Sequence, residues 1–240
     1  MQVPSGRTYA PFDVEVLRRL AVYRFLAHRD QPFKLKSGIM SNVYVFGRED
    51  LTDHPDLEWL IGGRICRDIW ANTQPGDRQH CLIGFPTAGT ALAQSAAMAS
   101  WQLVMAGGAE GSVICHRVMR EALKSHGAHP SWVNGDPDPE RHTYWGVDNV
   151  ATDGQTKIEG GAKLAEQGYP PIGQMGWYIF VDRQQGAVER LKRLGFERLV
   201  VGYRLLDVTF AFGELGLWPK SAVQAVEEEI REHQRLAARA

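Results

Sequence analysis

Short apolar runs alternate with stretches of helical periodicity along most of this chain. Five runs have the length of a β-strand and are bounded by glycine, proline or charged residues; they cover residues 81–84, 112–116, 144–148, 177–181 and 199–203. Such alternation is typical of strands that crossover helices connect around a parallel sheet. It therefore predicts an α/β fold in which helices flank a central parallel sheet.

Three segments show the apolar spacing of an amphipathic helix. The recurring positions are Val14, Leu17, Leu20 and Ala21 in the first, Leu57, Ile61, Ile65 and Ile69 in the second, and Val223, Val226 and Ile230 in the third. Asp53 and Pro55 mark the start of the second helix, and the third is expected to begin near Ser221. A chain of 240 residues can enclose one sizeable core, so we expect a single domain over residues 1–240.

The composition argues against several classes of function. A formal net charge of -1 gives no broad positive field for nucleic acid or for an anionic membrane, so neither is an expected partner. Cys66, Cys81 and Cys115 are irregularly spaced in apolar runs, which favours buried thiols over a disulfide framework or a zinc site. Because the amino terminus is polar and no apolar run reaches about eighteen residues, we expect a cytoplasmic protein.

The stretch from Tyr144 to Lys157 predicts a phosphate site. An apolar strand is expected to stop at Asp148 and Asn149, and a turn of small residues then opens a helix. The turn consists of Thr152, Asp153, Gly154, Gln155 and Thr156. Backbone N–H groups at such a turn bind phosphate, and the two residues at the strand end can accept hydrogen bonds from ribose hydroxyls. We interpret the stretch as a site for ribose 5-phosphate; the alternative is an ordinary strand-to-helix turn.

A second turn of small residues follows the run at 81–84. Thr87, Ala88 and Gly89 stand between this run and an alanine-rich helical segment, where small side chains let an oxygen-rich ligand approach the backbone. A diphosphate is the ligand that we expect here. Close packing of the helix on the sheet would explain the same residues, so both interpretations stay open.

The stretch from Tyr144 to Lys157 resembles the phosphoribosyl diphosphate (PRPP) motif of type I phosphoribosyltransferases. Four more segments resemble orotate phosphoribosyltransferases of this family and occur in the family's order; they cover residues 33–44, 83–90, 120–127 and 180–186. The resemblance implies a central parallel sheet flanked by helices and a small hood lobe formed mainly by residues 1–50. It also implies a mobile catalytic loop, residues 118–142, and a homodimer in which this loop reaches the neighbouring site.

The implied reaction transfers the phosphoribosyl group of PRPP to orotate, giving orotidine 5′-monophosphate and diphosphate. Mg²⁺ is implied as the cofactor, bound through PRPP rather than by protein ligands. By resemblance, Lys36 and Tyr44 help to hold the substrates, and Arg183 binds the orotate carboxylate, which suits a planar guanidinium. Arg120, Lys124, His126 and Asp148 are the implied catalytic residues. The three basic ones would place positive charge where the diphosphate departs.

Five residues of the expected site differ from the family's pattern, among them Ile39, which replaces an arginine, and Phe46, which replaces an aspartate. Asn149 replaces the second aspartate of the usual pair, Glu121 stands where a loop lysine is usual, and Asp153 enters the phosphate turn. Two hypotheses from different classes follow. The protein is either a working transferase for orotate or another base, or a catalytically weak relative that binds PRPP or a nucleotide in a regulatory role.

Overall fold

The computed structural model describes residues 1–35, 40–45, 53–108, 111–123 and 131–237. The helices are α1 (Pro11–Val22), α3 (Pro55–Ala71), α4 (Ala88–Met105), α5 (Gln155–Glu166), α6 (Ala187–Arg193), α7 (Leu205–Glu214) and α8 (Lys220–Ala237), with a 3-10 turn η1 (Ile172–Gln174). The strands are β1 (Leu26–Lys34), β2 (Met40–Val45), β3 (Gln79–Gly84), β4 (Cys115–Val118), β5 (His142–Ala151), β6 (Gly176–Asp182) and β7 (Arg198–Arg204).

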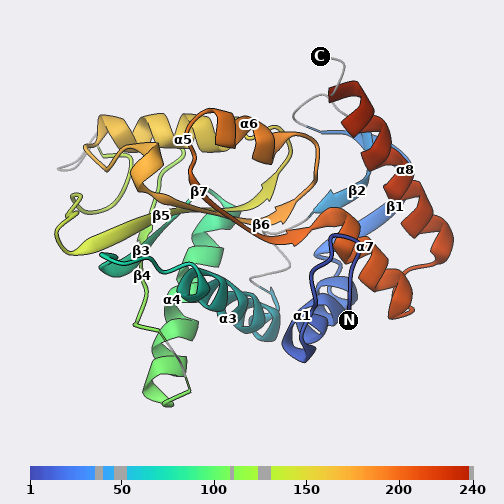
Figure 1. Ribbon diagram of the computed structural model, residues 1–240, viewed down its shortest axis with the longest axis horizontal. Coiled ribbons are helices and arrows are strands. Elements are labelled where there is room, and N and C mark those ends of the chain that lie inside the picture. The colour runs from blue at the N-terminus through green and yellow to red at the C-terminus, as the bar shows by residue number, and fades with distance from the viewer. Residues whose placement is uncertain (36–39, 46–52, 109–110, 124–130, 238–240) are drawn as a thin grey trace.

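A sheet of five parallel strands in the order β4-β3-β5-β6-β7 forms the centre of the molecule (Figure 1). Helices α5 and α6 cover one face of this sheet, and α3 and α4 cover the other. Each of the five predicted strands overlaps one of these strands, and the predicted α/β fold is confirmed. The parallel order brings the carboxyl ends of β3, β5 and β6 to the same edge.

Two strand boundaries differ from the prediction, each for a reason of hydrogen bonding. The strand expected at 112–116 begins only at Cys115, because the backbone of residues 112–114 bonds to side chains of α3 and α4 instead of to a ladder. The strand expected to stop at Asp148 and Asn149 continues to Ala151, because Val150 and Ala151 still pair with β6. Asp148 therefore lies within the paired part of β5, opposite Ile179 of β6, rather than beyond the end of the strand.

The three predicted amphipathic helices are present as α1, α3 and α8, and each buries most of its predicted apolar positions; Val14, Ala21 and Val223 are only partly buried. Helix α1 packs against α3 and α7, so this part of the expected hood segment belongs to the main core. The antiparallel pair β1-β2 forms a separate small sheet, and β2 packs against α8, where Val43, Val226 and Ile230 are fully buried. Among the residues described, no helix is long and apolar enough to cross a membrane.

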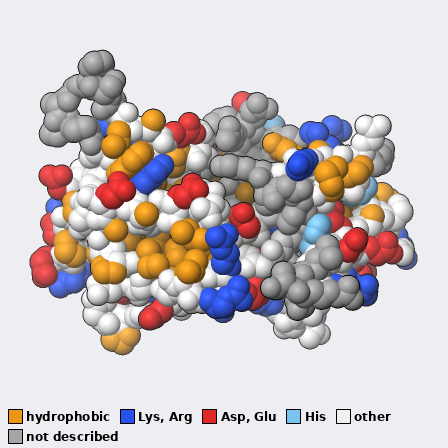
Figure 2. All heavy atoms as spheres, turned by 90° about the horizontal axis from the view of Figure 1, so that it is seen from above, with side chains coloured by type: hydrophobic (Ala, Val, Ile, Leu, Met, Phe, Trp, Pro, Cys, Tyr) orange, Lys and Arg blue, Asp and Glu red, His pale blue; other side chains and the backbone are white. Residues whose placement is uncertain are grey.

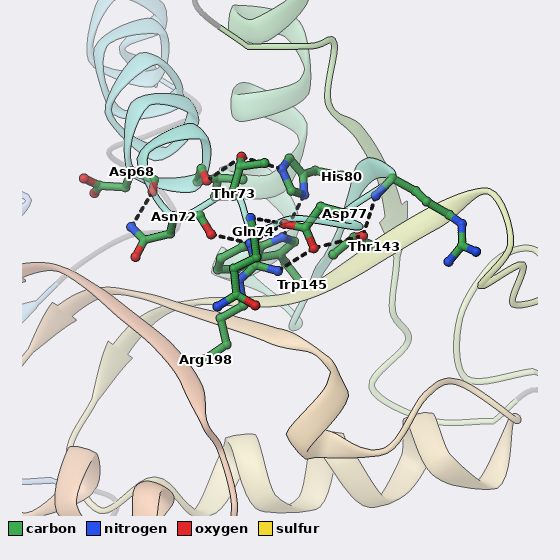
Figure 3. A network of polar contacts seen from close by, with 11 residues as sticks. Asp68, Asn72, Thr73, Gln74, Asp77, His80, Thr143, Trp145 and Arg198 are labelled. Carbon is green, nitrogen blue, oxygen red and sulfur yellow. Dashed lines mark hydrogen bonds and ion pairs between the residues drawn. The ribbon is translucent and has the colours of Figure 1, made fainter.

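A polar network ties the amino ends of the strands together, at the edge opposite the carboxyl ends (Figure 3). Arg198 at the start of β7 forms an ion pair of 2.6 Å with Asp77, and its guanidinium lies 4.4 Å from the centre of the Trp145 ring. The Trp145 indole N–H donates to His80 Nδ1 at 3.2 Å, and His80 Nε2 lies 3.0 Å from the Thr73 hydroxyl. Burial lowers the pKa of His80, so the neutral ring with its proton on Nε2 satisfies both contacts.

Candidate functional site

A pocket of about 780 Å³ opens at the carboxyl ends of the central strands, with β1 and β2 on its other side. Nine of the ten residues predicted to bind PRPP line this pocket: Asp148, Asn149, Thr152, Asp153, Gly154, Gln155, Thr156, Thr87 and Ala88. Tyr44 and Arg183 of the predicted substrate site line it as well. Open α/β sheets bind ligands at this edge, so the fold gathers the predicted residues where a ligand is expected.

The phosphate turn has the predicted form of a strand, a short turn and a helix N-terminus. Gly154 is the N-cap of α5 and has a φ of 81°, a left-handed conformation that glycine adopts without steric cost. Arg190 on α6 holds the turn from outside, since it donates to the Asp153 carbonyl at 3.0 Å and to Gln155 Oε1 at 2.9 Å. The Arg190 guanidinium therefore fixes the position of the turn through these two hydrogen bonds.

The Asp153 side chain accepts a hydrogen bond from one of the backbone N–H groups that a phosphate at this turn would use. Its Oδ1 accepts the Gln155 backbone N–H at 3.1 Å, so the carboxylate caps the positive end of α5. A phosphate entering the turn meets this negative charge at short range, where repulsion costs about 1 kcal/mol even in water. The side chain thus weakens anion binding without closing the turn.

Replacing Asp153 with asparagine is expected to tighten the binding of ribose 5-phosphate by about fivefold, because the charge is lost while asparagine remains a good capping residue. Isothermal titration calorimetry measures the change. Glu166→Gln, at the other end of the same helix, is the matched control and should leave the affinity as it is. Equal affinities for the wild type and Asp153→Asn would mean that the phosphate does not bind at this turn.

Asp148 forms an ion pair with a lysine that the sequence analysis did not single out. Its Oδ1 accepts the Asn149 backbone N–H at 2.8 Å, and its Oδ2 contacts Nζ of Lys157, which also donates to the Val150 carbonyl. Lys157 is 3% exposed and lies in the first turn of α5. A lysine is unfavourable at the positive end of a helix, and this misplaced charge was the available signal that it has an acidic partner.

The expected diphosphate turn, residues 87–89, shows both the predicted pocket-lining residues and the alternative packing role. Thr87 is the N-cap of α4, and Ala88 and Gly89 are its first two residues, so the helix begins earlier than expected. Thr87 and Ala88 line the pocket, whereas Gly89 lies beneath it. A Cβ on Gly89 would come within 2.4 Å of the Val147 carbonyl oxygen, so close packing of α4 on β5 explains this glycine. The Thr87 hydroxyl donates to Glu121 Oε1 at 2.9 Å. A diphosphate at this turn would therefore meet a carboxylate.

Aromatic side chains of the hairpin form the opposite wall of the pocket. Phe33 and Tyr44 line it, with their ring centres 5.1 Å apart. The Arg29 guanidinium lies 5.5 Å from the centre of the Phe33 ring and 5.1 Å from that of Tyr44. Phe33 and the neighbouring Lys34 were not among the predicted site residues. These flat apolar surfaces can pack against a planar base.

Arg183 lines the pocket, but its guanidinium is occupied by the protein. It is 2% exposed, donates to the Val43 carbonyl at 2.8 Å and to the Ser41 hydroxyl, and lies 3.7 Å from Glu229 Oε1 on α8. Its Nε donates to Gln185 at 3.3 Å. Burial lowers the pKa of Arg183 to about 10, and the charge of Glu229 opposes this shift. An incoming carboxylate would have to share the guanidinium with Glu229.

The described part of the expected mobile loop contains no helix or strand between β4 and β5. Arg120 does not line the pocket; its backbone N–H donates to the Trp132 carbonyl at 2.8 Å, and its side chain donates to the Ser131 carbonyl at 3.4 Å. Lys36, Lys124 and His126 lie outside the described residues. Their predicted roles therefore stay predictions.

Charges of both signs are mixed on the molecular face that is seen in Figure 2, where Lys, Arg, Asp and Glu side chains alternate with apolar ones. This matches a formal net charge of -1. Inside the molecule, burial raises the pKa of Asp182 to about 6, and the negative charge of Glu189 acts in the same direction. An anion at the pocket would thus be held by local groups rather than by a broad field.

The parallel sheet, the hairpin over its carboxyl edge and the phosphate turn together define the type I phosphoribosyltransferase fold. The structure superimposes on Leishmania donovani UMP synthase with a TM-score of 0.70 at 18% identity, over 91% of this chain and 42% of that one. The chain thus spans less than half the length of that protein. No protein-family model matches the sequence, and no match is found among curated proteins.

Two orotate phosphoribosyltransferases are also similar to this chain. That of Aeropyrum pernix has a TM-score of 0.59 at 24% identity and covers 85% of this chain and 99% of its own. That of Francisella tularensis has a TM-score of 0.64 at 14% identity and covers 91% of this chain and 98% of its own. At these identities the likeness is one of fold, and the function must be argued from the site.

Proposed function

We propose that this protein transfers the phosphoribosyl group of PRPP to a nitrogen of an aromatic base, with orotate as the acceptor. The observation that carries the proposal is one pocket in which a helix-terminal phosphate turn, Asp148 and an aromatic wall face the same space. The 5-phosphate would bind the turn at 152–156, and the ribose hydroxyls would donate to Asp148 and Asn149. The base would pack against Phe33 and Tyr44.

The proposed chemistry needs positive charge where the diphosphate leaves and protection of the ribosyl centre from water. Lys124 and His126, with Arg120, would supply the charge, and the loop 118–142 would exclude water when it closes. The orotate carboxylate would share the guanidinium of Arg183 with Glu229. A homodimer is part of the proposal, as the family resemblance implies, with the loop of one subunit reaching the pocket of the other.

The described residues do not fit a magnesium ion that the protein itself holds. No group of three His, Cys, Asp or Glu side chains able to hold a metal occurs among them. Both oxygens of Asp148 already have protein partners, and Asn149 is neutral. We therefore propose Mg²⁺ only as a companion of the PRPP diphosphate, and no step above depends on it.

The proposal is tested by incubating the protein with orotate and PRPP and following the loss of orotate absorbance. We expect turnover by the wild type and a decrease of about a hundredfold in Lys124→Ala, the size of effect seen when one group that stabilises developing charge is removed. Lys192→Ala, which removes an exposed lysine of α6 outside the pocket lining, is the control. Absence of turnover, or turnover indifferent to Lys124, would contradict the proposed function.

Two contacts favour a second candidate function, in which the protein binds PRPP or a nucleotide without efficient turnover. Glu121 reaches Thr87 of the diphosphate turn, and Asp153 caps the phosphate turn. Both carboxylates would lower turnover, because Glu121 opposes the negative charge that accumulates on the departing diphosphate and Asp153 weakens the hold on the 5-phosphate that positions the sugar. Saturable nucleotide binding that Asp148→Ala abolishes, combined with no turnover of orotate, is the result that would favour this candidate.

A further inference from the structure

The ion pair of Asp148 and Lys157 lies at the floor of the pocket, and both residues line it. Their side chains are 11% and 4% exposed, so two opposite charges are removed from water at the place where ribose is proposed to bind. Removing a lysine from water and placing it at the positive end of a helix are both unfavourable. The carboxylate of Asp148 compensates for both effects.

The pair changes the charge of the ribose subsite. A site with two acidic residues at the strand end would carry two negative charges beside an anionic substrate. Here Asn149 is neutral and Lys157 cancels the charge of Asp148, so these three residues together carry no net charge. The subsite can therefore accept an anionic sugar phosphate without a divalent cation to offset repulsion.

The same geometry leaves few oxygen atoms at this subsite for a metal ion to bind. Hard cations such as Mg²⁺ take oxygen ligands, mainly carboxylates and water. Oδ1 of Asp148 accepts the Asn149 N–H and Oδ2 contacts the Lys157 ammonium, which would also repel a cation. The charge that a metal would bring is already supplied by a side chain of the protein.

We infer that Lys157 is the resident cation of the ribose subsite, so that the 5-phosphoribosyl group binds to the Asp148–Lys157 pair without a divalent metal. This inference rests on the proposed function and specifies how its ribose end works. Lys157 is a positioning residue, because it acts on the sugar through the carboxylate that it orients. Any metal dependence of the reaction then belongs to the diphosphate end.

The test uses ribose 5-phosphate, which has the sugar and its phosphate but no diphosphate to carry a metal. Titration calorimetry compares the binding of ribose 5-phosphate to the full chain in EDTA and in about 5 mM MgCl₂. We expect the two dissociation constants to agree within about twofold. Binding that requires Mg²⁺, or that Mg²⁺ strengthens more than about tenfold, overturns the inference and leaves the proposed function standing. No binding in either buffer overturns both.

Variants of Lys157 test whether its ammonium is the cation of the ribose subsite. Lys157→Met is expected to weaken binding in EDTA by about tenfold or more, and added Mg²⁺ should restore part of the affinity, because it can now reach Asp148. Lys163→Met, on the same helix and away from the pocket lining, should bind like the wild type. If Lys157→Met fails to fold, Asp148→Asn combined with Lys157→Met removes both charges and is expected to fold but to bind weakly. Full affinity in either folded variant would overturn the role of Lys157.

Discussion

Asp148→Ala is expected to lower the free energy of unfolding by about 3 kcal/mol, because it leaves a buried ammonium without its carboxylate. Lys157 is 3% exposed, and its remaining described partner is the Val150 carbonyl. An unpaired buried charge costs more than the pair contributes, so the loss should exceed that of an ordinary surface aspartate. Urea denaturation measures the change in the free energy of unfolding.

A double variant separates the charge effect from the loss of side-chain volume. Asp148→Ala together with Lys157→Met removes both charges, and we expect it to recover at least half of the lost stability, because no buried charge remains. Asp153→Ala, at a partly exposed aspartate of the same turn, should cost about 1 kcal/mol through the lost cap. A loss below about 1 kcal/mol in Asp148→Ala would contradict a buried, tightly coupled pair.

Local sequence patterns were sufficient for the sheet and for both turns of the site. The alternation of apolar runs and helical segments predicted the five parallel strands. The small residues predicted a turn at 152–156, of which residues 152–154 precede α5 and Gln155 and Thr156 are the first residues of that helix. These features depend on backbone preferences within about ten residues, where the sequence carries the information directly. The boundaries were less accurate, since residues 112–114 and 150–151 are decided by partners on other elements.

The partners of the charged residues could not be predicted in the same way. Arg183 was expected to face a substrate carboxylate, but whether Glu229 would reach it depends on how α8 packs against β2. The contact of Glu121 with Thr87 likewise joins residues that no local pattern relates. Lys157 differs, since its place in the first turn of α5 could have been noticed as an unfavourable charge.

Arg183→Ala is expected to destabilise the protein by about 3 kcal/mol, since it removes a buried guanidinium that joins the sheet to the hairpin. The side chains of Arg183 and Glu229 are 2% and 10% exposed, and Arg183 also donates to the backbone of Val43. Without it, the Glu229 carboxylate keeps only the Asn42 backbone N–H at 3.0 Å among the hydrogen bonds described. Urea denaturation measures the loss, and hydrogen exchange should quicken at the amides of β2.

Helix α8 provides the matched control for this prediction. Arg231 pairs with Glu227 on the same helix at 3.4 Å, but its side chain is 65% exposed, so Arg231→Ala should cost less than about 0.5 kcal/mol. Glu229→Gln keeps the side-chain shape and removes the negative charge that pairs with the Arg183 guanidinium. If Arg183 binds the acceptor carboxylate, this variant should bind orotate more tightly, because the internal competitor is gone. Unchanged orotate affinity in Glu229→Gln, with Arg183→Ala still destabilised, would restrict Arg183 to joining the hairpin and the sheet.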